Sequence, residues 1–184
     1  MNINKPSGAL TLAGTIHTYK NWTFTSVGTG SFDPGTSTVV FGSGEAAVTI
    51  TGSHTLNNVT FVGYGVTHTI TAGTTLTVNG TLTFDATAFT NINTGILAAK
   101  GNVTVADAYA YGGTATLNLT GTANQTITSS GGSGTFRLSP TINKESGTVT
   151  LASALDLNYS GEDLTLTSGT LDLAGYALTV NDQF

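Results

Sequence analysis

The sequence predicts an all-β fold with almost no helix, in the form of a right-handed parallel β-helix, or β-solenoid. The first observation is short alternating runs of apolar and polar residues, best seen in residues 67–86. Such alternation places aliphatic side chains on one face of a strand and threonines on the other. The second is that glycines separate these runs, and the third is that similar blocks recur along the chain. No segment shows a 3.6-residue apolar period over the length of a helix.

The composition fits many short neutral strands joined by tight turns. Charged residues make up 8% of the chain, against about 25% in an average globular protein. The 184 residues include 38 threonines and 24 glycines, and 39% of them are hydrophobic. This apolar fraction is enough for a core and argues against disorder. The chain has no cysteine, which excludes disulfides and thiolate metal sites and is compatible with an extracellular protein.

The charge pattern argues against nucleic-acid binding. The formal net charge is −5, and the five basic residues do not cluster. Nucleic-acid binding requires several cations that neutralise phosphates on one surface, so we expect no nucleic-acid partner. No apolar run reaches 18 residues, so we expect no membrane insertion.

The strands and turns follow one another at short intervals along the chain. Asp33-Pro34-Gly35 predicts a tight turn, because proline presets φ and glycine permits the next position. Residues 108–113, AYAYGG, are expected to form a loop, and residues 89–97 form a less regular segment anchored by apolar side chains. The alternating runs expected to be strands are 9–14, 22–24, 39–41, 47–52, 55–63, 67–86, 102–106, 114–121, 125–130, 134–139, 149–151, 155–157, 164–166, 171–173 and 178–180.

Self-comparison reveals internal repeats. Residues 38–53 match residues 116–130, with Ile50 over Ile127. Residues 75–84, TLTVNGTLTF, match residues 163–173, DLTLTSGTLDL. Repetition of strand units is the signature of a solenoid.

The repeats predict a single domain over residues 1–184. It would contain superrepeats at approximately 30–105 and 114–184, with residues 1–29 as an N-terminal coil, cap or end-pairing segment. With coils of roughly 20 to 25 residues, the chain would make roughly seven to nine coils. Their stack would be about 35 to 45 Å long.

The alternative fold is a β-sandwich or jelly roll, which also has short alternating strands with frequent turns. The pair Asn79-Gly80 is a hairpin signal that favours antiparallel strands locally. In a solenoid the same pair would form a coil corner. The repeats favour the solenoid, because duplicated blocks arise naturally in a stack.

Three segments carry a resemblance to known proteins. They are GSFDPGTSTVVFGSGEAAVTITGSHTLNNVTF, then TLTVNGTLTF, then GTLDLAGYALTV. These resemble repeats of large secreted bacterial surface proteins of the adhesin and autotransporter-passenger type, which are parallel β-helices. The likeness covers residues 22–105 and returns in weaker form over residues 114–182. It implies an extracellular or cell-surface protein, and it brings no catalytic motif.

The sequence predicts no catalytic residue, cofactor or metal site. A glycan-cleaving β-helix would need two or three acids on one face at a fixed separation. Asp156 and Asp172 occupy outward positions about one coil apart, but we expect them to be ordinary solvated residues. The histidines His17, His54 and His68 are well separated and are expected to be exposed or satisfied by hydrogen bonds, with His68 on the threonine side of its run or at a loop edge.

The best candidates for carbohydrate contact are two tyrosines and the two acids. Tyr109 and Tyr111 lie in the expected loop, where their rings could stack on sugars, together with Asp156 and Asp172. Seven N-x-S/T sequons occur, from Asn21 to Asn158, and they would matter in a host that glycosylates surface proteins.

The sequence therefore favours a non-enzymatic extracellular structural or adhesion module. A solenoid has two open ends with unpaired backbone groups, which template further strand pairing. We expect these ends to contact copies of the chain or neighbouring repeats of a longer chain, giving a filament or surface layer. Surface glycans are a further candidate partner. The alternative function is a carbohydrate-binding or polysaccharide-cleaving β-helix.

Overall fold

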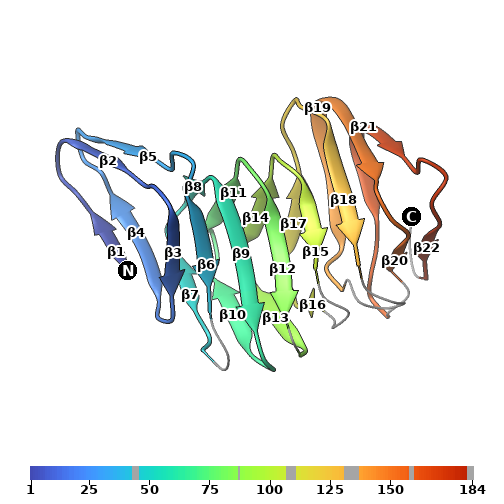
Figure 1. Cartoon of the computed structure of the whole chain (residues 1–184), viewed down its shortest axis with the longest axis horizontal. Coiled ribbons are helices and arrows are strands. Elements are labelled where there is room, and N and C mark those ends of the chain that lie inside the picture. The colour runs from blue at the N-terminus through green and yellow to red at the C-terminus, as the bar shows by residue number, and fades with distance from the viewer. Residues whose placement is uncertain (43–45, 87, 107–110, 131–136, 158–159, 182–184) are drawn as a thin grey trace.

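The chain winds into a stack of parallel strands. The computed structural model describes residues 1–42, 46–86, 88–106, 111–130, 137–157 and 160–181. Every element in these ranges is a β-strand, and the strands form a parallel β-solenoid of about seven turns (Figure 1). This confirms the predicted all-β solenoid. It excludes the sandwich, whose sheets are antiparallel, because the strand pairs are parallel.

Each turn contributes to three faces. The first face is a six-stranded sheet in the order β1 (Asn2–Asn4), β4 (Trp22–Ser26), β7 (Thr49–Thr51), β10 (Thr67–Ile70), β13 (Thr90–Asn93) and β16 (Tyr111–Gly112). The second face contains β8 (His54–Leu56), β11 (Thr75–Val78), β14 (Ile96–Ala99) and β17 (Thr116–Leu119). The third face contains β3 (Thr15–Thr18), β6 (Thr38–Phe41), β9 (Asn58–Gly63), β12 (Leu82–Ala86), β15 (Val103–Val105) and β18 (Gln125–Ser129).

The remaining strands lie toward the two ends. Near the N-terminus β2 (Ala9–Thr11) pairs with β5 (Ser31–Asp33). Near the C-terminus β20 (Leu155–Leu157) pairs with β22 (Leu178–Val180), and β21 (Thr165–Asp172) pairs with β19 (Pro140–Leu151). Of the predicted strand 134–139, residues 134–136 lie outside the described residues, and residues 137–139 are not a strand, because the next strand begins at Pro140.

Strand β19 turns a corner without a break. Its first half pairs with β17 of the second face, and its second half pairs with β18 of the third face. Gly147 lies at this corner with φ of 77°, and a Cβ atom there would lie 2.7 Å from the carbonyl oxygen of Thr122. Only glycine fits both the backbone angle and the close approach.

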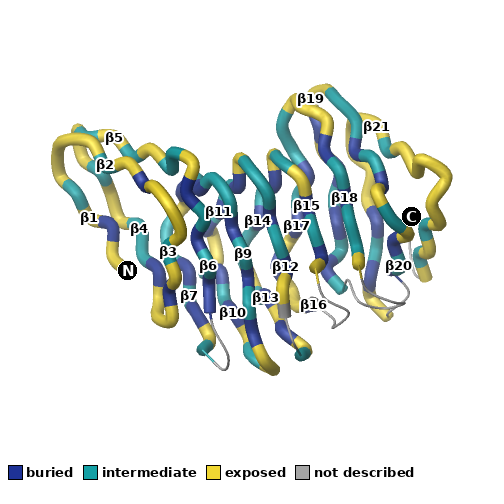
Figure 2. Tube along the Cα trace, in the orientation of Figure 1, coloured by how far each residue is buried: buried dark blue, intermediate teal, exposed yellow. Residues whose placement is uncertain are grey.

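The core consists of inward side chains stacked in columns from turn to turn. One column on the second face runs in register through Leu56, Val78, Ala99, Leu119, Ile142 and Leu166. The first five of these side chains are 0% exposed, whereas Leu166 in the last turn is 44% exposed. In this column, full burial therefore requires a turn on both sides. Figure 2 shows the buried positions concentrated in the inner turns.

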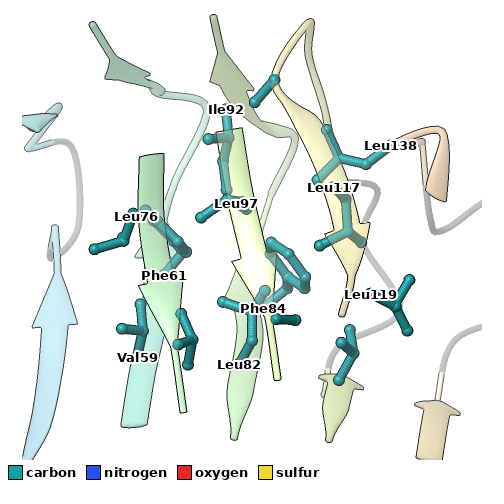
Figure 3. Close-up of a cluster of buried hydrophobic side chains, with 14 of the residues drawn as sticks. Val59, Phe61, Leu76, Leu82, Phe84, Ile92, Leu97, Leu117, Leu119 and Leu138 are labelled. Atoms are coloured by element: carbon teal, nitrogen blue, oxygen red, sulfur yellow. The ribbon is translucent and has the colours of Figure 1, made fainter. Parts of the chain in front are cut away.

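A phenylalanine column runs along the third face. Phe41 is aligned with Phe61, and Phe61 with Phe84. The Phe41 and Phe61 rings stack at 5.4 Å between centroids, and the Phe61 and Phe84 rings stack at 6.1 Å. Figure 3 shows Phe61 and Phe84 among the aliphatic side chains that fill the space between the faces. Aromatic stacking adds to the stabilisation from burial alone.

Asparagines support the corners between turns. Where a backbone N–H has no carbonyl opposite it, an asparagine side chain one turn earlier accepts its hydrogen. The Oδ1 atom of Asn102 accepts from Thr126 N at 2.9 Å, for example. The other pairs of this kind are Asn21 with Thr49, Asn58 with Thr81, Asn93 with Thr114, and Asn124 with Thr148.

The corner asparagines account for four of the N-x-S/T sequons in the sequence. Asn21, Asn58, Asn102 and Asn124 each precede a buried residue and then an outward threonine. The N-x-T pattern is thus what a corner asparagine followed by an alternating strand produces. Asn79-Gly80 also lies at a corner, between β11 and β12, where Gly80 N donates to Asn57 O at 2.8 Å. It is the coil corner expected for a solenoid.

Replacing Phe61 with alanine is expected to destabilise the solenoid by about 3–5 kcal/mol, because it empties the middle of the phenylalanine column. The midpoint of urea unfolding, followed by circular dichroism, measures the effect. The control is Thr60→Ala in the same strand, a half-buried outward position, which should cost less than about 1 kcal/mol. Equal losses in the two variants would contradict the importance of this column.

Candidate functional site

The two predicted acids do not face each other along one ladder. Asp156 in β20 is aligned with Thr179 of β22, whereas Asp172 at the end of β21 is aligned with Thr150 of β19. The Asp172 carboxylate accepts a hydrogen bond from Ala174 N at 2.9 Å and so supports a turn. The register therefore does not form the pair of adjacent carboxylates that glycan cleavage would need. Both acids stay candidates for carbohydrate contact.

The segment 108–113, which the sequence predicts to be a loop with two tyrosines, contains part of a strand. Tyr109 lies outside the described residues. Tyr111 belongs to β16, where its backbone is aligned with Thr90 of β13, so the loop prediction is wrong at this position. A parallel ladder extends this far because residues 111–112 continue the first face.

Other aromatic side chains are exposed at the corners between the third face and the next first face. Tyr19 is 51% exposed, and Tyr64 and Phe89 are each 57% exposed. The sequence suggested Phe89 as an apolar anchor, but its ring lies on the surface with the Arg137 guanidinium 4.8 Å from its centroid. Such cation–π contact tolerates exposure, and alternation alone could not indicate it, because Phe89 lies in a turn.

His54 is held within an aromatic cluster in the core by hydrogen bonds and ring stacking. Trp22 Nε1 donates to His54 Nε2 at 2.9 Å, and His54 Nδ1 lies 2.7 Å from the carbonyl oxygen of Gly52. Nε2 accepts and Nδ1 donates, which fixes one neutral tautomer. The imidazole stacks on Phe24 at 5.0 Å and on Trp22 at 6.1 Å. Burial lowers the pKa of His54, opposed only partly by the Gly52 hydrogen bond.

His68 is also a core residue, and its predicted place on the threonine side is wrong. It shares the inward side of β10 with Ile70, and both are 0% exposed. Its Nδ1 accepts a hydrogen bond from Val48 N at 3.2 Å, and its Nε2 donates to Val62 O at 2.9 Å. Burial lowers the pKa of His68, with the Val62 hydrogen bond acting in the opposite direction.

The buried histidines are structural rather than metal-binding. Both ring nitrogens of His54 and of His68 already have hydrogen-bond partners within the core. Among the described residues, no group of three or more His, Asp or Glu side chains is arranged to hold a metal ion. His68 links Val48 to Val62, and His54 links Trp22 of the first face to Gly52.

A buried lysine closes the corner between the second and third faces. Lys144 is 2% exposed. Its Nζ atom donates to Gln125 Oε1 at 2.6 Å, to Ala123 O at 2.8 Å and to Thr120 O at 3.4 Å. Gln125 Nε2 in turn donates to Ala99 O at 2.9 Å and to a second carbonyl. Burial lowers the pKa of Lys144, while three acceptors satisfy its three hydrogens.

Two shallow depressions lie on the surface, and their walls are polar. The larger, of about 460 Å³, lies over the Lys144 corner and the smaller measures about 360 Å³. The larger is lined by Asn79, Lys100, Thr120, Gly121, Thr122, Ala123 and Glu145. The smaller is lined by Gly113, Thr114, Ala115, Thr116, Ser139, Thr141 and Gly161. Neither lining contains a pair of acids, so neither supports general acid–base chemistry of the glycosidase type.

Comparisons with known proteins give no match, so inferences about function rest on the fold and on the side chains described above. No protein-family model, curated protein or solved structure matches the chain. Within the described ranges, no helix is long and apolar enough to span a membrane.

The stability of the solenoid is expected to fall as the pH drops below about 6.5, the pKa of an unperturbed histidine. Below that pH the unfolded chain binds protons that folded His54 and His68 resist, because burial lowers their pKa. Between the folded and unfolded pKa values, stability therefore rises with pH, by up to about 1.4 kcal/mol per pH unit for each histidine. Urea midpoints between pH 5 and 8 measure this.

Two histidine variants test that assignment. His54→Gln should reduce the dependence on pH, since it removes one buried group that titrates. His17→Gln, at an exposed position, should leave the dependence unchanged. A wild-type midpoint that stays constant from pH 8 to 5 would contradict the role of the buried histidines.

The change Lys144→Met is expected to destabilise the chain by about 1–3 kcal/mol, because it leaves the carbonyl oxygens around Nζ buried without a donor. Lys100→Met makes the same chemical change at an exposed position near the same corner and should stay within about 0.5 kcal/mol of wild type. Thermal unfolding at pH 7 compares the two. A Lys144 variant as stable as the Lys100 variant would show that the lysine is dispensable.

Proposed function

We propose that this chain is a non-enzymatic extracellular module, a β-rod for structure or adhesion that assembles end to end. The observation that carries the proposal is that the last turn exposes large apolar side chains. Leu166, Leu173 and Tyr176 are 44%, 39% and 46% exposed, although Leu166 continues a column that is fully buried in the preceding turns. Residues 165–170 of β21 are all exposed. The last turn thus exposes side chains of the kind that fill the core in earlier turns. The trace of β21 is largely coloured as exposed in Figure 2.

Unpaired strand edges at both ends support the same proposal. Among the described residues, β1, β2 and β3 each pair with a strand on one side only, as do β21 and β22 at the other end. Such edges offer a row of backbone donors and acceptors to a further strand. Another turn of the same shape would satisfy both the backbone and the exposed columns.

The use of polar side chains supports a structural role over catalysis. The buried histidines, Lys144 and Gln125 are occupied by hydrogen bonds that hold turns together. The corner asparagines serve the backbone in the same way. These groups therefore act on the chain itself and not on a substrate.

Carbohydrate binding is the second candidate. The observation that favours it is the position of Tyr19, Tyr64 and Phe89, whose exposed rings lie at the same kind of corner in different turns. Exposed aromatic rings offer an apolar face, on which a sugar ring could stack. A rod with such an edge would combine spacing with adhesion.

Purified chain is expected to increase in mean mass with concentration and to form rods longer than one molecule, because stacking buries Leu166 and its neighbours. Light scattering after size-exclusion chromatography and electron microscopy measure this. Leu166→Thr should weaken association, whereas Tyr64→Thr, an equally exposed change on the long side of the rod, should not. Wild-type particles that stay monomeric at the highest concentration would refute end-to-end assembly.

A further inference from the structure

Charge is distributed unevenly along the rod. Residues 1–32 contain Lys5 and Lys20 and no acid, and the first acid is Asp33. Residues 145–184 contain no lysine or arginine and six acids: Glu145, Asp156, Glu162, Asp163, Asp172 and Asp182. Since the strands stack in chain order, the first turn is basic and the last turns are acidic.

One pair of opposite charges also lies at the same passage between two faces. Lys5 lies between β1 and β2, at the passage from the first face to the second. Asp163 lies just before β21, at the same passage in the last turn. Lys20 follows β3, at the passage from the third face to the next first face. The register along the third face aligns Asp172 with Thr15 at the start of β3, so Asp172 lies on the same face as Lys20 but not beside it. Stacking the last turn on a first turn would bring Asp163 to the passage that carries Lys5.

We propose that the C-terminal turn of one molecule docks on the N-terminal turn of a second copy, so that the acidic end of one molecule lies against the basic end of the next, with Asp163 toward Lys5. This inference rests on the proposed end-to-end assembly and specifies its partner and polarity. The contact is heterologous, so it repeats without closing and gives a polar filament.

Strand direction favours this polarity. All turns pair in parallel, and a first turn stacked on a last turn continues that pairing. Two last turns facing each other would be related by a two-fold axis and would pair antiparallel. They would also bring two acidic ends together. Both the backbone pattern and the charge therefore select the N-terminal turn as the partner.

Both ends of the rod carry apolar side chains that stacking would bury. The last turn exposes Leu166, Leu173 and Tyr176, while the first turn offers the half-buried Leu10 and Ile16. Apolar burial supplies the affinity of such a contact. The exposed charges contribute orientation and rate of association, which makes assembly sensitive to salt.

Reciprocal charge exchange tests the proposal. One variant carries Lys5→Glu and Lys20→Glu, and the other carries Asp163→Lys and Asp172→Lys. Each variant alone sets like charges against each other across the contact, so its association should weaken by at least about tenfold relative to wild type. An equimolar mixture restores opposite charges and should recover assembly. Sedimentation velocity at low salt measures all three samples, and circular dichroism verifies that the variants are folded.

A matched control carries the same kinds of change in the middle of the rod. Asp85→Lys and Lys100→Glu alter exposed side chains of inner turns and should leave association at the wild-type level. If wild type assembles and the mixture of variants does not recover, end-to-end assembly stands and the head-to-tail contact is refuted. If the Asp163 and Asp172 variant assembles with wild type better than with the lysine variant, the contact joins two C-terminal turns instead. A wild type that never assembles refutes both proposals.

Discussion

The structure depends on one constraint: along the second face, an inward side chain is fully buried where a turn lies on both of its sides. The column from Leu56 to Ile142 is fully buried, and its next member, Leu166, is largely exposed for lack of a further turn. Stability in such a stack arises between neighbouring turns more than within one. The solenoid therefore creates a long shared core and, at its ends, surfaces that are chemically equivalent to that core.

Polar side chains meet a second requirement, which is to satisfy backbone groups where the chain turns. Strand ladders pair the backbone along the faces, but the corners leave N–H and C=O groups without strand partners. Asparagines accept hydrogen bonds from the next turn, and His68 bridges the backbone N–H of Val48 and the carbonyl of Val62. His54 bridges the Gly52 carbonyl and the Trp22 indole N–H, and Lys144 donates to carbonyl oxygens and to Gln125. These hydrogen bonds offset part of the cost of burying the lysine, and they explain why the buried polar groups are poor evidence for chemistry.

The two constraints together shape what the protein can do. The long sides of the rod are closed by paired strands and occupied corners, with exposed aromatics as their main irregularity. The ends are open, apolar at the last turn and opposite in charge. This asymmetry supports the proposal of a structural rod with a direction.

The sequence by itself determined the strand type, the turn length and the identity of most core residues, because alternation with period two places inward residues without reference to the rest of the fold. It also indicated the corner at Asn79-Gly80. It did not reveal the burial of Lys144, because a charged side chain gives no apolar signal even though it continues the inward alternation of Ile142 in β19. It did not reveal the exposure of Phe89 either, because Phe89 lies outside the strands. Only the tertiary structure decided these, together with the separation of Asp156 from Asp172 and the continuous bend of β19. Their positions depend on which residues of the next turn lie opposite, and that register is set by the length of every intervening corner.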